Sequence, residues 1–69
     1  MPKKVRELKA MLRKAGFSAR PGKGSHTVWN HPALADNIAL SGGDGDDAQP
    51  YQEKKVREII RKLQEVQDE

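Results

Sequence analysis

The chain has no cysteine, and it has one tryptophan, one tyrosine and one phenylalanine among its 69 residues. Without cysteine it forms neither disulfides nor thiolate metal sites, which is compatible with a reducing compartment. No apolar run approaches the roughly 20 residues of a membrane span, and the N-terminal segment lacks the apolar stretch of a signal peptide. We therefore expect a single small domain, residues 1–69, that is soluble, cytoplasmic and not bound to a membrane.

Charge is divided unevenly along the chain. Residues 1–30 carry eight lysines and arginines against one acidic residue, a net charge of +7, whereas residues 31–69 carry a net charge of −4. A positive segment this concentrated favours polyanionic partners such as nucleic acid. A solvated basic helix face next to an acidic half would give the same composition, so charge alone leaves both explanations open.

Two segments have the period of an amphipathic helix. The first predicts a helix over residues 3–15 that ends at Gly16, which suits a left-handed C-cap. Its apolar positions are Val5, Leu8, Leu12 and Ala15. The second helix begins at Pro50 and has the clearer stripe. Its apolar positions are Val56, Ile59, Ile60, Leu63 and Val66.

Three short segments between the helices are typical of β-strands, at residues 17–20, 25–31 and 37–41. Residues 21–24 predict a turn, and Pro32 ends the second strand because it has no N–H for a ladder. Residues 42–47 predict a polar and mobile loop. The order α-β-β-β-α predicts an α+β fold with both helices on one face of a three-stranded antiparallel sheet.

Trp29 has two possible environments. Side chains alternate along a strand, so Trp29 shares a face with Thr27, while His26 lies on the other face. Trp29 either joins Phe17 and Ile38 in the core or lies on the open face as a platform for stacking bases. A domain of this size has few large apolar residues, so we expect Trp29 in the core.

The turn Gly22-Lys23-Gly24-Ser25-His26 is the segment best suited to chemistry. Its glycines allow a phosphate to approach closely, Lys23 can neutralise that phosphate, and Ser25 offers a hydroxyl group. Free histidine has a pKa of about 6.5, so it can give or take a proton at neutral pH. RNA cleavage by the substrate's own 2′-hydroxyl needs a base, an acid and nearby cations but no metal. From these residues alone, a structural or simply exposed His26 in a hairpin remains the more common explanation.

The other polar groups have simpler explanations. His26 and His31 are five residues apart, which does not provide the four ligands of a structural zinc site, so we expect no metal. Glu58 and Lys62 are spaced i, i+4 and predict a salt-bridged solvent face on the last helix. Lys54 is different because it lies near the N-terminus of that helix, where phosphate binds favourably.

Four segments together resemble the HicA family of bacterial toxins. They are Ala15-Gly16-Phe17, Lys23-Gly24-Ser25-His26, Trp29-Asn30-His31-Pro32 and Ile38-Ala39-Leu40-Ser41. The resemblance covers nearly the whole chain. It implies a fold similar to the double-stranded RNA-binding domain and the toxin of a type II toxin–antitoxin system, acting as a metal-independent mRNA endoribonuclease without a cofactor.

The resemblance also implies roles for individual residues. His26 matches the catalytic histidine, Gly24 and Ser25 shape its turn, and a HicB-type antitoxin covers the histidine. We expect RNA phosphates to contact five cations. They are Lys9, Arg13, Arg20, Lys23 and Lys54. The group that supplies the second proton transfer stays open between Lys23, His31 and water.

The chain departs from the family at three places. Thr27 stands where many relatives have a second histidine, residues 33–36 replace a short Asp-Gly hairpin, and the loop 42–49 is more acidic than usual. Two other classes of function also fit the residues. One is a non-catalytic RNA-binding module, and the other is a protein-interaction domain that uses the last helix. We expect the free chain to be a monomer.

Overall fold

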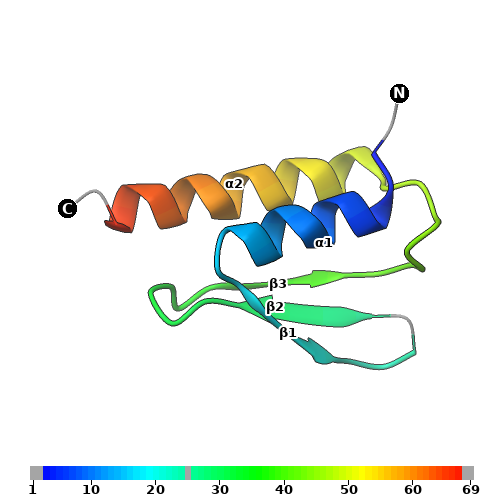
Figure 1. The fold of residues 1–69 in the computed structure, drawn as a ribbon, viewed down its shortest axis with the longest axis horizontal. Helices are drawn as coiled ribbons and strands as arrows, with labels where there is room; N and C mark the ends of the chain where they lie inside the picture. The colour runs from blue at the N-terminus through cyan, green and yellow to red at the C-terminus, as the bar shows by residue number, and fades with distance from the viewer. Residues whose placement is uncertain (1–2, 25, 68–69) are drawn as a thin grey trace.

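The structure is a computed structural model that describes residues 3–24 and 26–67. Its elements are α1 (Val5–Lys14), β1 (Ser18–Pro21), β2 (Thr27–Asn30), β3 (Asn37–Leu40) and α2 (Pro50–Gln67). Both helices lie over one face of the sheet, and the other face is uncovered (Figure 1). The predicted α+β fold, with its order α-β-β-β-α and its three antiparallel strands, is confirmed.

The register of the sheet decides which residues face the helices. The strand order is β1-β2-β3, and Trp29 pairs with Ala19 on one side and with Ile38 on the other. Residues directly opposite each other in an antiparallel pair point to the same face. Trp29 and Ile38 therefore lie under the helices, whereas Val28 and its partner Arg20 lie on the uncovered face.

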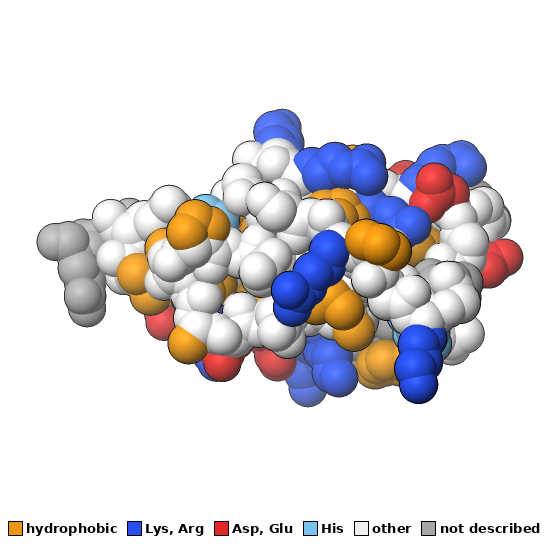
Figure 2. Space-filling view, turned by 90° about the horizontal axis from the view of Figure 1, so that it is seen from below, with side chains coloured by type: hydrophobic (Ala, Val, Ile, Leu, Met, Phe, Trp, Pro, Cys, Tyr) orange, Lys and Arg blue, Asp and Glu red, His pale blue; other side chains and the backbone are white. Residues whose placement is uncertain are grey.

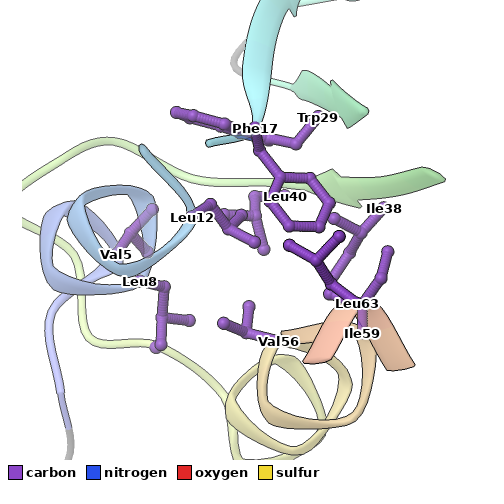
Figure 3. Packing of buried hydrophobic residues seen from close by; sticks show 11 residues of the cluster. Val5, Leu8, Leu12, Phe17, Trp29, Ile38, Leu40, Val56, Ile59 and Leu63 are labelled. Atoms are coloured by element: carbon purple, nitrogen blue, oxygen red, sulfur yellow. The ribbon is translucent and has the colours of Figure 1, made fainter. Parts of the chain in front are cut away.

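The core lies between the sheet and the two helices, and Figure 3 shows its packing. Trp29 has a relative exposure of 0%, and Phe17 and Ile38 each have 5%. The prediction that these three lie in the core is confirmed, so Trp29 is not a platform for bases. The other buried hydrophobic residues are Val5, Leu8, Leu12, Leu40, Ala48, Val56, Ile59 and Leu63.

Gly16 ends α1 as predicted. It has a φ of +98°, a left-handed conformation that L side chains rarely adopt. Its N–H donates to the carbonyl of Arg13 at 3.0 Å, and the N–H of Phe17 donates to the carbonyl of Leu12 at 3.0 Å. This pair of hydrogen bonds is a Schellman motif, which satisfies the last carbonyls of the helix and turns the chain into β1.

The loop 42–47 is hydrogen-bonded to the start of α1, a contact that the prediction of a polar loop did not include. The N–H of Val5 donates to the carbonyl of Asp46 at 2.9 Å, and Lys4 pairs with Asp47 in an isolated β-bridge. The first N–H groups of a helix have no partner within the helix, and here the loop supplies acceptors for them. The basic first helix and the acidic loop 42–47 therefore contact each other directly.

Several element boundaries, by one or two residues, and the exposure of Val66 differ from the sequence prediction. The helix α1 begins at Val5 rather than at residue 3, and β2 begins at Thr27 rather than at residue 25. Val66 is 46% exposed although it continues the apolar stripe of α2, because the last turns of this helix extend past the sheet (Figure 1). Neither helix in the described part of the chain combines the length and apolar character needed to cross a membrane.

Candidate nucleic-acid interface

The hairpin between β1 and β2 fixes the backbone of His26 at both of its polar groups. The His26 carbonyl accepts a hydrogen bond of 2.9 Å from the N–H of Gly22, and the His26 N–H donates to the carbonyl of Lys23 at 3.0 Å. Gly24 closes the turn with a φ of +59°. The backbone of His26 is therefore held, while the residue is exposed to solvent.

Gly22 leaves room next to His26. A Cβ atom added at Gly22 would lie 3.3 Å from the carbonyl oxygen of His26 and 3.4 Å from its Cβ atom. At position 24 the left-handed backbone conformation favours glycine, whereas at position 22 the short distance to His26 leaves little space for a side chain. A side chain at position 22 would crowd the carbonyl group and the Cβ atom of His26, so the close pairing of these two residues favours glycine here.

The open sheet face carries cations near the hairpin. His26 lies opposite Gly22, which continues the register of β1 and β2. Side chains two residues apart in a strand point to the same face, so His26 lies on the open face with Val28. Arg20 pairs with Val28 on that face. Lysine and arginine side chains spread over this face, and acidic side chains lie toward its margins (Figure 2). Lys23 and Arg20 form no ion pair with any residue that the structure describes.

His31 lies at the other end of β2 and has a structural environment. Its Nδ1 accepts a hydrogen bond of 3.0 Å from the N–H of Ala33, and its ring packs edge-on against Phe17 with centroids 5.4 Å apart. Five residues of extended chain separate it from His26 by about 16 Å. The two histidines of one chain therefore cannot act on the same phosphate. Residues 3–24 and 26–67 hold no group of three or more histidines and acids that could bind a metal ion.

The helical cations predicted to contact RNA lie away from the hairpin or have other partners. The Nζ of Lys9 lies 2.7 Å from Oδ1 of Asp44, and the Lys9 side chain is only 15% exposed. The hydrogen bond from Lys9, with its positive charge, lowers the pKa of Asp44 below the ordinary value of 3.8. Arg13 places its guanidinium 5.3 Å from the centre of the Trp29 ring, and Lys54 is exposed near the start of α2. Ser25 lies outside the described residues.

Thr27 has a structural role that was not predicted from the sequence. Its Oγ1 accepts a hydrogen bond of 2.9 Å from Nε1 of Trp29. A threonine two residues before a tryptophan in a strand lies on the same face, so the sequence contained a signal for this contact. Thr27 is thus turned toward the helix side of the sheet, away from the face on which His26 lies.

These features define a class of small α+β domain with one covered sheet face, one open face and a basic hairpin that presents a histidine. Residues 5–65 match the family model described as HicA toxin of bacterial toxin–antitoxin. The chain belongs to this HicA family and is a toxin of a toxin–antitoxin pair. Comparison with curated proteins and with solved structures found no match.

Proposed function

We propose that this toxin is an endoribonuclease that cleaves mRNA and that His26 carries a proton in the reaction. The observation that supports this most is the exposed His26 on a backbone held by two hydrogen bonds. A fixed backbone limits the positions that the imidazole can take, which favours proton transfer in one geometry. An mRNA substrate implies the cytoplasm as its place of action, and a HicB-type antitoxin keeps the toxin inactive.

The reaction uses a nucleophile that the RNA itself supplies. The imidazole of His26 accepts the proton of a 2′-hydroxyl, and the 2′-oxygen attacks the adjacent phosphorus. The new P–O2′ bond forms as the P–O5′ bond breaks, and the departing 5′-oxygen takes up a proton. The products are a 2′,3′-cyclic phosphate and a 5′-hydroxyl. Proton transfer by a positioned side chain contributes roughly 10²–10⁴-fold to such a rate.

Two candidates remain for the proton on the departing oxygen. The distance along β2 and the packing of His31 against Phe17 argue against His31 in this role. Lys23 lies in the same turn as His26 and is exposed, so its ammonium group is one candidate, and water is the other. Lys23 also supplies positive charge where the phosphorane gains negative charge.

The exposed hairpin suits a polymer substrate. Gly22, Lys23, Gly24 and His26 are all exposed, so a chain of nucleotides can approach them without entering a closed cavity. Arg20 lies on the same face two residues before Gly22 and contacts a neighbouring phosphate in this proposal. Gly24 shapes the turn, while Arg13 and Lys54 contact RNA further from the cut. Lys9 contributes only if its pair with Asp44 opens.

The reaction is tested with an RNA oligonucleotide and a copy that carries a single 2′-deoxynucleotide at the cleaved position. We expect the purified toxin to cut the RNA and to leave a 2′,3′-cyclic phosphate, and to leave the deoxy position intact. A cut at the deoxy position, or a 5′-phosphate on the product, would contradict the use of the 2′-hydroxyl. RNA that is bound but never cut would show a non-catalytic RNA-binding module instead.

A further inference from the structure

The hydrogen-bond pattern of the sheet shows which backbone groups face outward at each edge. In an antiparallel pair, hydrogen-bonded and non-bonded residue pairs alternate. The N–H of Gly22 bonds to the carbonyl of His26, so the pair two residues on, Arg20 with Val28, is also bonded. Thr27 and Trp29 then bond to β3 through Leu40 and Ile38. The N–H and C=O groups that point out of the sheet belong to Ala19 and Pro21 in β1 and to Asn37 and Ala39 in β3.

The two edges differ in how they are protected. Proline and charged residues commonly protect an edge strand against a further strand. Pro21 has no N–H, and β1 also contains Arg20, so β1 offers only the N–H of Ala19. The strand β3 has neither proline nor a charged residue, and it offers the N–H groups of both Asn37 and Ala39. In the described part of the chain, no hydrogen bond from outside the sheet reaches the backbone of β3. The edge of β3 is therefore open to another strand.

A groove lies along this open edge. One side is formed by residues 36–39 and the other by the face of α2 that carries Lys55, Glu58, Ile59 and Lys62. An added strand would place alternate side chains into such a groove, where Ile59 forms part of the wall. The ion pair between Lys62 and Asp36, 2.8 Å long, closes one end.

An exposed aromatic residue lies one helical turn from the groove, in contact with a lysine that lines it. Tyr51 is 56% exposed, and it precedes Lys55, which lines the groove, by one helical turn. The ammonium group of Lys55 lies 5.8 Å from the centre of the Tyr51 ring. Phe17 and Trp29 are buried, so Tyr51 is the one aromatic residue of the chain that can contact a partner. Tyrosine is enriched among the residues that dominate protein–protein binding energy.

Charge argues against a second copy of this chain as the occupant. The helix α2 runs antiparallel to β3 (Figure 1). A two-fold pairing of β3 with β3 centred on Ile38 would bring Lys55 toward Lys62 of the other copy and the two Glu58 residues toward each other. Facing like charges disfavour such an interface. A different protein avoids this repulsion if it presents an acidic residue to Lys55 and a basic residue to Glu58.

We propose that an extended segment of the antitoxin binds as a fourth strand along β3, with its backbone bonded to Asn37 and Ala39 and its side chains between β3 and α2. The choice of the antitoxin as the partner rests on the proposed function. The choice of this surface rests on the open edge of β3, the groove and Tyr51. This surface is on the outer side of β3, whereas the His26 hairpin joins β1 and β2. The antitoxin thus holds the toxin at a place separate from the residue that it inactivates.

The test compares two proline substitutions in otherwise whole toxin. Ala39→Pro removes an outward N–H of β3, and Ala19→Pro removes the equivalent group of β1, so neither removes a bond within the sheet. The probe is the purified HicB-type antitoxin of this toxin, and its Kd is measured by calorimetry. We expect Ala39→Pro to weaken binding about tenfold or more and Ala19→Pro to change it less than about twofold. Equal effects of the two variants would overturn the proposal.

Two further measurements keep the proposal testable if Ala39→Pro does not fold. Hydrogen exchange of the wild-type amides at Asn37 and Ala39 is expected to slow when the antitoxin binds, and unchanged exchange there would overturn the proposal. Protection of the same amides by RNA alone, or by self-association of the toxin, would overturn it too. Tyr51→Ala is expected to weaken antitoxin binding, while Val66→Ala, the matched exposed residue, has no effect.

RNA cleavage separates this inference from the proposed function. Ala39→Pro is expected to cut RNA at the wild-type rate and to escape inhibition by the antitoxin. If wild-type toxin cuts no RNA, the proposed function fails, while the Kd values and the exchange data still decide where the antitoxin binds.

Discussion

The indole N–H of Trp29 donates a hydrogen bond of 2.9 Å to the hydroxyl oxygen of Thr27, the residue that directly follows His26. Trp29 is the largest fully buried side chain of the core, so its one polar group needs this acceptor. In this chain Thr27 supports the core, and no second histidine stands directly beside His26.

Replacing Thr27 with valine is predicted to destabilise the protein. Valine has a similar shape but no acceptor, so the buried Nε1–H of Trp29 loses its partner, at a cost of about 1–3 kcal/mol in the free energy of unfolding. Urea denaturation followed by tryptophan fluorescence measures the change. Thr27→Ser keeps the hydroxyl and is the control. Equal stabilities of the valine and serine variants would show that the hydrogen bond contributes nothing.

Gly16→Ala is predicted to be destabilising for two reasons. The φ of +98° strains any L side chain, and a Cβ atom at Gly16 would lie 3.2 Å from Nε2 of His31. A residue forced into such a conformation costs roughly 1–3 kcal/mol. Thermal unfolding measures the loss. Gly45→Ala is the matched control, because Gly45 has no positive φ and a Cβ atom there meets nothing within 4 Å. Similar melting temperatures for the two variants would contradict this explanation.

The contact between Lys9 and Asp44 predicts a pH dependence of stability. The pKa of Asp44 is lowered in the folded state, so the unfolded chain takes up this proton first as pH falls. The pair therefore stabilises the fold above pH 3.8, the ordinary pKa, and its contribution is lost as pH falls through the lower pKa of the folded state. Asp44→Asn is expected to be less stable than wild type at neutral pH, with the difference shrinking in acid. Unfolding curves between neutral pH and the acid range measure it, and a constant difference would exclude the ionic contribution.

Arg20 is predicted to contact an RNA phosphate on the open face. In a His26→Ala background, which is expected to leave the RNA whole, Arg20→Ala is expected to weaken RNA binding and to reduce the salt slope by about 0.7. Arg57→Ala is the control, since Arg57 lies on α2 and pairs with Glu53. Binding titrations at several salt concentrations give the slope. A slope that Arg20→Ala leaves unchanged would remove Arg20 from the interface.

The fold follows from local patterns, which is why the sequence predicts it well. The spacing of Leu8 and Leu12, the glycine at position 16 and the alternation around Trp29 are each readable within a few residues. The contacts of residues 42–47 are not readable in this way. Lys9 and Asp44 are 35 positions apart, and nothing in either segment shows that they meet.

In the candidate site, too, local features can be predicted from the sequence and long-range contacts cannot. The hairpin that presents His26 is local, so its turn residues can be named from the sequence. In the sequence, His26 and His31 are close enough to suggest that both take part in one proton-transfer reaction. The extended geometry of β2 separates them, and the hydrogen bond from Ala33 to His31 gives His31 a structural role instead. The open edge of β3 depends on strand order, which the sequence alone does not specify.

The most direct test of the central claim compares His26→Ala with His31→Gln on the same RNA. Both variants remove one imidazole, but only His26 is assigned to the reaction. We predict that His26→Ala lowers the single-turnover cleavage rate by roughly 10²-fold or more while its melting temperature stays near that of wild type. His31→Gln should cleave at close to the wild-type rate with a lower melting temperature. A folded His26→Ala variant that cleaves as fast as wild type would contradict the account.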